Sequence, residues 1–257
     1  MGSLLMISKY RERKPDRGAC EAAAVAEPSP AREAAAAAAA ELVEPGMTIG
    51  LGSGRAVWAL TERLPAGTRA VVASERTREV ALGDGIEVIE LDGSFEIDLV
   101  LDGADEVGPG LGLIKGGGGA LLREKIVIAA ARRFVVVAEA SKRVERLGEG
   151  FRLPVEVVRF GWADTRRRVA ALLPDAELRT AEGKGSDTSQ EGSDPPYLTD
   201  EGHYILDCAI PEGTDPGSLG AELHAVPGVV EHGLFLGMAS LALLGHPDGS
   251  VERLTAG

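Results

Sequence analysis

The stretch Leu101–Val127, LDGADEVGPGLGLIKGGGGALLREKIV, joins the end of a strand, two aspartates, a lysine, a glycine run and the start of a helix. The apolar run 97–101 has the length and composition of a short buried strand, so Asp102 and Asp105 follow its carboxyl end. Open α/β sheets bind their ligands at this edge. We therefore expect the functional site of the protein to lie here.

The glycine run, Gly116 to Gly119, precedes a helix that we expect over 120–132. Bare backbone N–H groups beside a helix N-terminus can bind an anionic or hydroxyl-rich ligand, and Lys115 adds a positive charge at the edge of the run. The sequence therefore predicts a binding loop for a polar small molecule.

Glu124 lies on the apolar face of this expected helix, because Leu121, Glu124 and Ile128 are spaced at i, i+3 and i+7. A carboxylate in apolar surroundings has a raised pKa, which suits a general base that works near neutral pH. The alternative is a structural glutamate at the helix edge, paired with a distant arginine. The periodicity alone is compatible with both interpretations.

Composition narrows the class of protein. The 257 residues are 44% hydrophobic and 26% charged, enough for a substantial core and two structural units. The net charge of -13 disfavours nucleic acid or an anionic membrane as a general partner. Cys20 and Cys208 lie far apart, which argues against a disulfide framework, and the apolar run 4–7 is too short for a signal peptide. We expect a soluble, cytoplasmic protein without a membrane span.

Strands and helices alternate through the first part of the chain, which indicates a parallel sheet covered on both faces. After Gly150 the pattern resembles a small α+β unit with a polar surface loop. The expected domains are a poorly ordered extension at 1–30, a larger domain of 31–150 plus 241–257, and a small α+β domain at 151–240. The expected strands are 47–52, 69–73, 87–91, 97–101, 134–139, 153–160, 177–180, 204–210, 229–236, 241–244 and 251–254; the helices are 32–43, 56–64, 75–82, 120–132, 164–173 and 215–225; the loop is 183–196.

A second glycine turn, Gly50–Arg55, joins an expected strand to an expected helix. A dinucleotide fingerprint would need glycine where Arg55 stands, so a phosphate loop is the simpler interpretation: the glycines permit close approach, Ser53 offers a hydroxyl and Arg55 a charge. A plain connection without a ligand remains an alternative. Lys142 follows the strand 134–139 and falls on the same presumed ligand edge, unless it is a solvated surface lysine.

Several catalytic classes fit poorly. The four histidines (His203, His224, His232 and His246) show no metal-ligand spacing. The carboxylates of Asp102, Asp105 and Glu106 could hold Mg²⁺, but Lys115 and the glycine run favour an organic anion. The remaining parts, a carboxylate base with a lysine and backbone N–H groups, fit proton abstraction beside a carbonyl in a phosphorylated small molecule.

Five motifs together resemble ribose-5-phosphate isomerase of the A type, and the resemblance runs in order from about 32 to 254. It implies an aldose-ketose isomerase of the pentose phosphate pathway that interconverts D-ribose 5-phosphate and D-ribulose 5-phosphate through an enediol, without a metal or nucleotide cofactor. It also implies a Rossmann-like α/β domain with a smaller α+β domain, assembled as a homodimer or homotetramer. The motifs are DGADE at 102–106, LIKGGGGALLREK at 113–125, AEASK at 138–142, LPVEV at 153–157 and PGVV at 227–230.

Matching positions imply roles for individual residues. Glu124 would be the general base that moves the proton between C1 and C2. Asp102, supported by Asp105, would handle the substrate hydroxyl or ring-opening proton, and Lys115 would stabilise the enediolate. The implied substrate-binding residues are Ser53, Gly54, Arg55, Ala56, Gly103, Ala104, Gly116, Gly117, Gly118 and Lys142.

The sequence departs from the family pattern at the phosphate end. The family loop usually reads Thr-Gly-Ser-Thr, whereas residues 53–56 read Ser-Gly-Arg-Ala, and Arg32 stands where the first helix often carries a lysine. A non-catalytic sugar-phosphate-sensing domain is the rival interpretation, although it would not need Glu124 and Lys115 together. A nucleotide-dependent oxidoreductase is disfavoured by Arg55.

Overall fold

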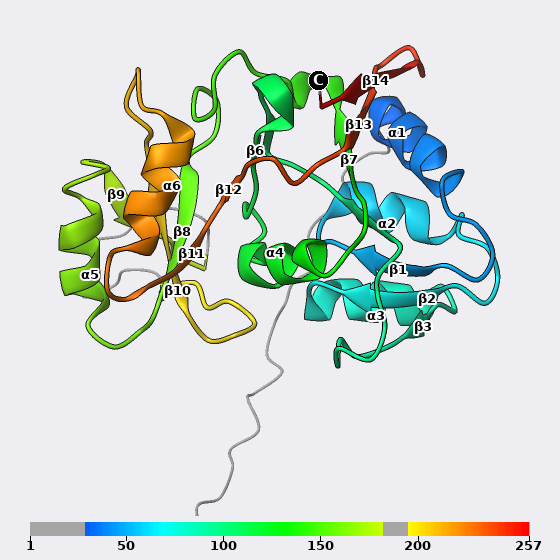
Figure 1. The fold of residues 1–257 in the computed structure, drawn as a ribbon, viewed down its shortest axis with the longest axis horizontal. Coiled ribbons are helices and arrows are strands. Elements are labelled where there is room, and N and C mark those ends of the chain that lie inside the picture. Colours follow the sequence, from blue (N-terminus) through cyan, green and yellow to red (C-terminus); the bar gives the residue numbers. More distant parts are fainter. Residues whose placement is uncertain (1–28, 182–194, 257) are drawn as a thin grey trace, which may run out of the picture.

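The computed structural model describes residues 29–181 and 195–256, which form two lobes side by side (Figure 1). The larger lobe contains a seven-stranded sheet in the order β14-β13-β7-β4-β1-β2-β3. Its neighbouring strands are parallel except for β13 and β14. The α/β fold with a mostly parallel central sheet is therefore confirmed. The strands are β1 (Thr48–Leu51), β2 (Arg69–Val72), β3 (Glu87–Val88), β4 (Leu99–Asp102), β7 (Phe134–Glu139), β13 (Leu241–Gly245) and β14 (Val251–Thr255).

Helices cover both faces of this sheet, so its central strands are buried on both sides. One face packs against α1 (Pro30–Ala40), α2 (Arg55–Thr61) and α3 (Glu75–Gly83). The other face packs against α4 (Leu121–Ala129), which lies between the large sheet and the small lobe (Figure 1). The carboxyl end of β4 and the first turn of α4 are thereby brought to one side of the sheet.

The first helix begins two residues before the predicted start and ends three before the predicted end. The hydroxyl of Ser29 accepts the N–H of Arg32, and Pro30 suits the first helical turn because it lacks the N–H that would be unpaired there. The buried alanine face lets α1 lie directly on β13, where a Cβ at Gly245 would come within 1.8 Å of the Ala31 carbonyl oxygen.

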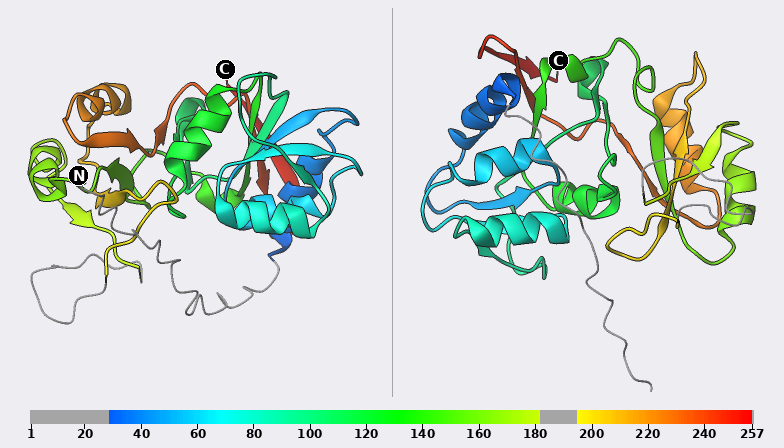
Figure 2. Two further views of the ribbon diagram at one scale, coloured as in Figure 1. Left: turned by 90° about the horizontal axis from the view of Figure 1, so that it is seen from below. Right: turned by 180° about the vertical axis from the view of Figure 1, so that it is seen from behind.

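The small lobe is a four-stranded antiparallel sheet in the order β11-β8-β10-β9 with two helices on its outer face (Figure 2, left view). Alternation along the strands turns Leu206 and Cys208 toward these helices, whereas Ile205 joins the core of the larger lobe. The inner face of the small sheet is thus directed at the larger lobe. The elements are β8 (Leu153–Val157), α5 (Trp162–Val169), β9 (Ala176–Leu178), β10 (Tyr204–Cys208), α6 (Pro216–His224) and β11 (Val229–His232).

Three short strands connect the lobes: β5 (Glu106–Val107), β6 (Leu113–Ile114) and β12 (Leu234–Phe235), in the order β12-β6-β5. The single strand predicted over 229–236 is therefore wrong, since it divides into β11 and β12 at Gly233. A Cβ at Gly233 would lie 2.2 Å from the carbonyl oxygen of Lys115, so the two chain segments approach as closely as backbone allows.

The other predicted elements are present, the strand at 134–139 with the predicted ends and the rest with shifted ends. Most predictions ran too long, as for the strand at 87–91, of which Glu87–Val88 is paired, and the helix at 120–132, which ends at Ala129. Two 3-10 turns, Pro109–Leu111 and Ala140–Lys142, were not predicted. The extension at 1–30 falls outside the described residues up to residue 28, and the loop at 183–196 does so for residues 183–194. Among the described helices, none is long and apolar enough to cross a membrane.

Candidate active site

A buried ion cluster lies where the central motif meets the sheet. Lys115 follows β6, Asp102 ends β4 and Glu124 lies in the first turn of α4. The Lys115 Nζ is 2.8 Å from Oδ2 of Asp102 and 3.2 Å from Oε2 of Glu124, and it donates to the carbonyl oxygen of Gly103 at 2.7 Å. All three charged side chains are almost completely buried. Glu124 therefore faces the protein, as its helical spacing predicted, and its partner is the lysine that follows β6.

The burial of this cluster shifts its proton affinities. Burial raises the pKa of Glu124 to about 8; nearby Asp102 adds to the rise, and Lys115 opposes it. Burial also raises the pKa of Asp102, against the effects of Lys115 and of the backbone N–H groups of Gly103 and Ser53. Burial alone would lower the pKa of Lys115, but the two carboxylates outweigh it and raise that pKa. The cluster thus contains a cationic lysine and a glutamate that can exchange its proton near neutral pH.

One oxygen of each carboxylate contacts Lys115. Oδ1 of Asp102 accepts the N–H of Gly103 at 2.7 Å. Its Oδ2, like Oε2 of Glu124, contacts Lys115 but has no hydrogen bond with good geometry in the described part of the chain. Asp102 is packed so closely against the first glycine loop that a Cβ at Gly52 would lie 1.8 Å from its Cγ. This position must therefore be glycine.

The glycine run lines the same cavity as Glu124. Gly116 and Gly119 have φ values of +106° and +81°, which other residues rarely adopt, so the chain can reverse here before α4. The N–H of Gly117 donates to Oδ2 of Asp105 at 2.8 Å. Asp105 is thus tied to the glycine run, and it lies outside the Lys115 cluster.

A cavity of about 210 Å³ opens above these groups. Its lining includes every residue for which the sequence predicted a catalytic or binding role except Asp102. Asp102 contacts Lys115, which is part of the lining. Arg32, Val137, Ala138 and Glu139 also line it. The predicted residues in its lining are Ser53, Gly54, Arg55, Ala56, Gly103, Ala104, Asp105, Lys115, Gly116, Gly117, Gly118, Glu124 and Lys142.

Three further basic residues line the cavity. Arg55 starts α2, Lys142 ends the 3-10 turn after β7, and Arg32 reaches in from α1. Glu139 pairs with Arg32 at 2.8 Å and holds its side chain. The sequence singled out Arg32 by register, but gave no signal for Glu139, because that glutamate reads as the last residue of an apolar strand.

Two further side chains reach the site from the small lobe. Arg179 donates to the carbonyl oxygens of Gly116 and Gly117, and the Tyr197 hydroxyl donates to that of Gly118. Neither residue lies in a recognisable motif. Their contact with the glycine run depends on how the lobes pack, which local sequence patterns do not report.

The carboxylates that suggested a Mg²⁺ site have other partners. Glu106 is buried, and its two oxygens accept the backbone N–H groups of Gly148, Gly150 and Phe151, each at 2.6 Å. This arrangement anchors the segment that leads to the small lobe. With Asp102 paired to Lys115 and Asp105 bonded to Gly117, the three acidic side chains of the motif do not converge on a shared cation position.

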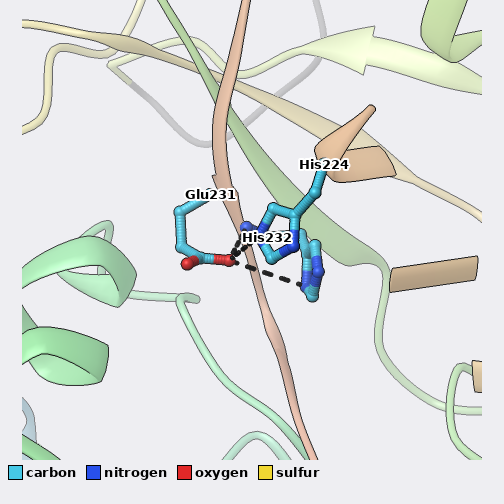
Figure 3. Close-up of side chains that lie close together, drawn as sticks. All are labelled: His224, Glu231 and His232. Atoms are coloured by element: carbon cyan, nitrogen blue, oxygen red, sulfur yellow. Dashed lines mark hydrogen bonds and ion pairs between the residues drawn. The ribbon is translucent and has the colours of Figure 1, made fainter. Parts of the chain in front are cut away.

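Two histidines meet despite their lack of metal-ligand spacing. His224 from α6 and His232 from β11 lie with Glu231, and their ligand atoms are within 4.8 Å of one another (Figure 3). However, Lys125 Nζ lies 2.8 Å from the same Glu231 oxygen that contacts His224 Nε2 at 2.8 Å. Lys125 also donates to the carbonyl oxygens of residues 232 and 234. The ammonium thus occupies the cation position, and this cluster ties α4 to the small lobe.

Comparisons with known proteins agree on one family. A family model described as ribose 5-phosphate isomerase A (phosphoriboisomerase A) matches residues 69–249. The chain is 48% identical over 232 residues to a ribose-5-phosphate isomerase A of Synechococcus sp. (strain JA-3-3Ab), covering 87% of this chain and 96% of that protein. It is 50% identical over 229 residues to that of Roseiflexus castenholzii, covering 86% and 94%.

Solved structures give the same result. A D-ribose-5-phosphate isomerase in complex with phospho-erythronic acid superposes with a TM-score of 0.78 at 31% identity, covering 87% of this chain and 97% of that one. The ribose 5-phosphate isomerase A of Neisseria gonorrhoeae has a TM-score of 0.78 at 32% identity, covering 88% and 96%.

Proposed function

The chain belongs to the ribose 5-phosphate isomerase A family and interconverts ribose 5-phosphate and ribulose 5-phosphate, and we propose that Glu124 is the base of this reaction. The observation that carries the proposal is a buried carboxylate with a pKa raised to about 8 on the wall of the cavity, 3.2 Å from a buried lysine. A base with a pKa near the working pH combines sufficient ionisation with sufficient proton affinity.

The proton transfer proceeds within one side of the cavity. Ionised Glu124 removes the proton from C2 of the open-chain aldose, and the electrons of the C–H bond form the C1–C2 double bond while negative charge moves to O1. The ammonium of Lys115 stabilises that charge. Glu124 then returns its proton to C1 as the carbonyl forms at C2.

The oxygen-bound protons need a second group. Asp102 has a raised pKa and lies against Lys115, so it can carry a proton between O2 and O1 or assist ring opening. Asp105 supports it from the glycine run, where the bond to the N–H of Gly117 fixes its carboxylate. The backbone N–H of Gly118, which lines the cavity and has no acceptor in the described part of the chain, binds a substrate hydroxyl.

The phosphate binds among the basic residues of the lining. Arg55 and Lys142 supply charge, and Ser53, Gly54 and Ala56 belong to the same loop as Arg55. Arg32 contributes within its pair with Glu139. Phospho-erythronic acid, which the similar structure contains, has a carboxylate and a phosphate. We propose that the cavity binds it with the carboxylate at Lys115, where it mimics the enediolate.

Replacing Glu124 by glutamine tests the proposal, because glutamine keeps the size of the side chain but cannot accept the proton. We expect kcat to fall by roughly 10²–10⁴, the usual contribution of a positioned acid–base group. Binding of phospho-erythronic acid should persist. Glu156→Gln is the matched control, since Glu156 is also buried with a raised pKa but lies in β8, outside the cavity lining. Near-normal turnover of Glu124→Gln would transfer the base to Asp102 or Asp105.

We also propose a domain division, an oligomeric state and a cellular location for the protein. Residues 31–150 with 241–257 form the catalytic domain and 151–240 the small domain, a division supported by their separate sheets. Assembly as a homodimer or homotetramer in the cytoplasm rests on the family resemblance. Light scattering at assay concentration tests the assembly, and a monomeric mass would contradict it.

A further inference from the structure

The carbonyl oxygens of the glycine run are bound from the small lobe. Nη1 of Arg179 lies 2.9 Å from the carbonyl oxygen of Gly116 and 3.1 Å from that of Gly117. The Tyr197 hydroxyl lies 3.0 Å from the carbonyl oxygen of Gly118. Three consecutive peptide groups of the cavity wall are therefore held by side chains that lie more than 60 residues away in the sequence.

Arg179 is itself held rigidly. Its guanidinium is buried at 7% exposure, with Nε 2.8 Å from Oδ2 of Asp207 and Nη2 2.5 Å from Oδ1. Such a two-point pair fixes the plane of the guanidinium as well as its position. The Tyr197 ring lies beside it, with 5.8 Å from its centroid to the guanidinium carbon. One edge of Arg179 is thus bound within the small lobe, and Nη1 is left to contact the glycines.

These contacts determine the direction of the N–H groups. In a trans peptide the carbonyl and the N–H of one plane point in opposite directions. Holding the carbonyl of Gly116 directs the N–H of Gly117 to Asp105, to which it donates at 2.8 Å. Holding the carbonyl of Gly117 directs the N–H of Gly118, which belongs to the same peptide plane, away from Arg179. That N–H has no hydrogen-bond acceptor in the described part of the chain, and Gly118 lines the cavity.

Without Arg179, the Gly116–Gly117 plane would keep the bonds from the N–H of Gly119 and to Asp105. The Gly117–Gly118 plane would lose its hydrogen bond to Arg179, and its rotation would carry little steric cost, because glycine tolerates a wide range of φ and ψ. A rotated plane would present a carbonyl oxygen to the substrate in place of the N–H group that binds a hydroxyl. Misplacement of a binding group by about 1 Å can reduce a rate by roughly 10²-fold.

We propose that Arg179 is a positioning residue of the isomerase, which acts across the lobes by orienting the peptide groups of Gly116 to Gly118 toward the substrate. Asp207 orients Arg179 in turn. This inference rests on the proposed function, in which the glycine run binds a substrate hydroxyl.

The test compares two arginines of the small lobe. Arg179→Met removes the contact with the glycines and the pair with Asp207. Arg152→Met is the matched control: Arg152 pairs with Asp175 and donates to the carbonyl oxygen of Asp207, so it also links small-lobe groups, but it does not contact the glycine run. Asp207→Asn and Arg179→Lys serve as milder variants if Arg179→Met does not fold. For each protein we measure kcat, KM and the Ki of phospho-erythronic acid per folded molecule, together with the pH profile.

We expect Arg179→Met to lower kcat/KM by roughly 10–100-fold and to raise the Ki, because the hydroxyls of the inhibitor would lose the same oriented N–H group. The apparent pKa of the pH profile should stay unchanged, and Arg152→Met should stay within about twofold of wild type. Equal losses in the two arginine variants, or wild-type constants per folded molecule in Arg179→Met and both milder variants, would overturn the inference. If Glu124→Gln is inactive while Arg179→Met is normal, this inference alone fails; if Glu124→Gln is active, the proposed function fails independently.

Discussion

Replacing Lys115 by methionine removes the cation that lies 2.8 Å from Asp102 and 3.2 Å from Glu124, both buried. Methionine is similar in length and apolar, so the change isolates the loss of charge. Removing one partner from a buried ion pair costs about 3–5 kcal/mol, because the remaining charge is left without compensation. For a chain of this size that corresponds to a fall of about 6–20 °C in Tm.

The cost should depend on pH, with a defined sign. The pKa values of Asp102 and Glu124 are already raised, chiefly by burial, and the loss of Lys115 raises both further. A carboxyl group whose folded pKa lies above its unfolded pKa contributes stability that is fully present below the unfolded pKa. That contribution is lost as the pH rises through the folded pKa. Lys115→Met should therefore lose little stability near pH 5 and most near pH 9.

Urea unfolding at pH 5.5 and pH 8.5 measures this difference, with Lys142→Met as the control. Lys142 lines the same cavity, is only partly buried and has no buried carboxylate within ion-pair distance among the described residues. Its replacement should change stability slightly and equally at both values. If Lys115→Met lost the same free energy of unfolding at pH 5.5 as at pH 8.5, the assignment of two buried, proton-binding carboxylates beside Lys115 would be refuted.

Three further outcomes are expected. The kcat/KM should rise about tenfold per pH unit and level off near pH 8, because Glu124 must be ionised to act as the base and burial raises its pKa to about 8; a flat profile from pH 6 to 9 would contradict this role. Arg55→Ala should raise KM with little change in kcat, since an exposed arginine at the phosphate end binds ground state and transition state alike. An unchanged KM would leave the phosphate to Arg32 and Lys142. Exhaustive dialysis against a chelator should leave kcat unchanged, because Lys115 already neutralises Asp102, and a loss restored by metal would support the Mg²⁺ alternative.

The sheet was predictable because its strands carry their own signal. Strands such as β7, FVVVAE, are apolar runs between turn residues, so their existence follows from composition alone. The predicted ends of the strands and helices were less accurate than their positions. The residues that follow Val88 in β3 and Ala129 in α4, for example, are as apolar as those inside these elements. The two-residue strands β5 and β6 are too short for any periodicity, and they form because β12 returns from the small lobe to pair with β6.

In the candidate site, too, some residues could be identified from local sequence and others could not. Glu124, Lys115 and the glycine run lie within ten residues of one another, so the sequence could assign them to one site, although it did not predict the ion pair between Lys115 and Glu124. Arg179 and Glu139 act through contacts with residues 63 and 107 positions away, so no local pattern could identify them. For the same reason the meeting of His224 with His232 was missed: a helix end and a strand are brought together by the packing of the small lobe.

Transfer of the C2 proton tests the central assignment most directly. The substrate is ribose 5-phosphate with deuterium at C2, and the label is followed by NMR at C1 of ribulose 5-phosphate and in the solvent. Wild type should move the label from C2 to these two destinations. Folded Glu124→Gln that still binds phospho-erythronic acid should do so roughly 10²–10⁴ times more slowly. Label transfer by Glu124→Gln at close to the wild-type rate would show that another group removes the proton.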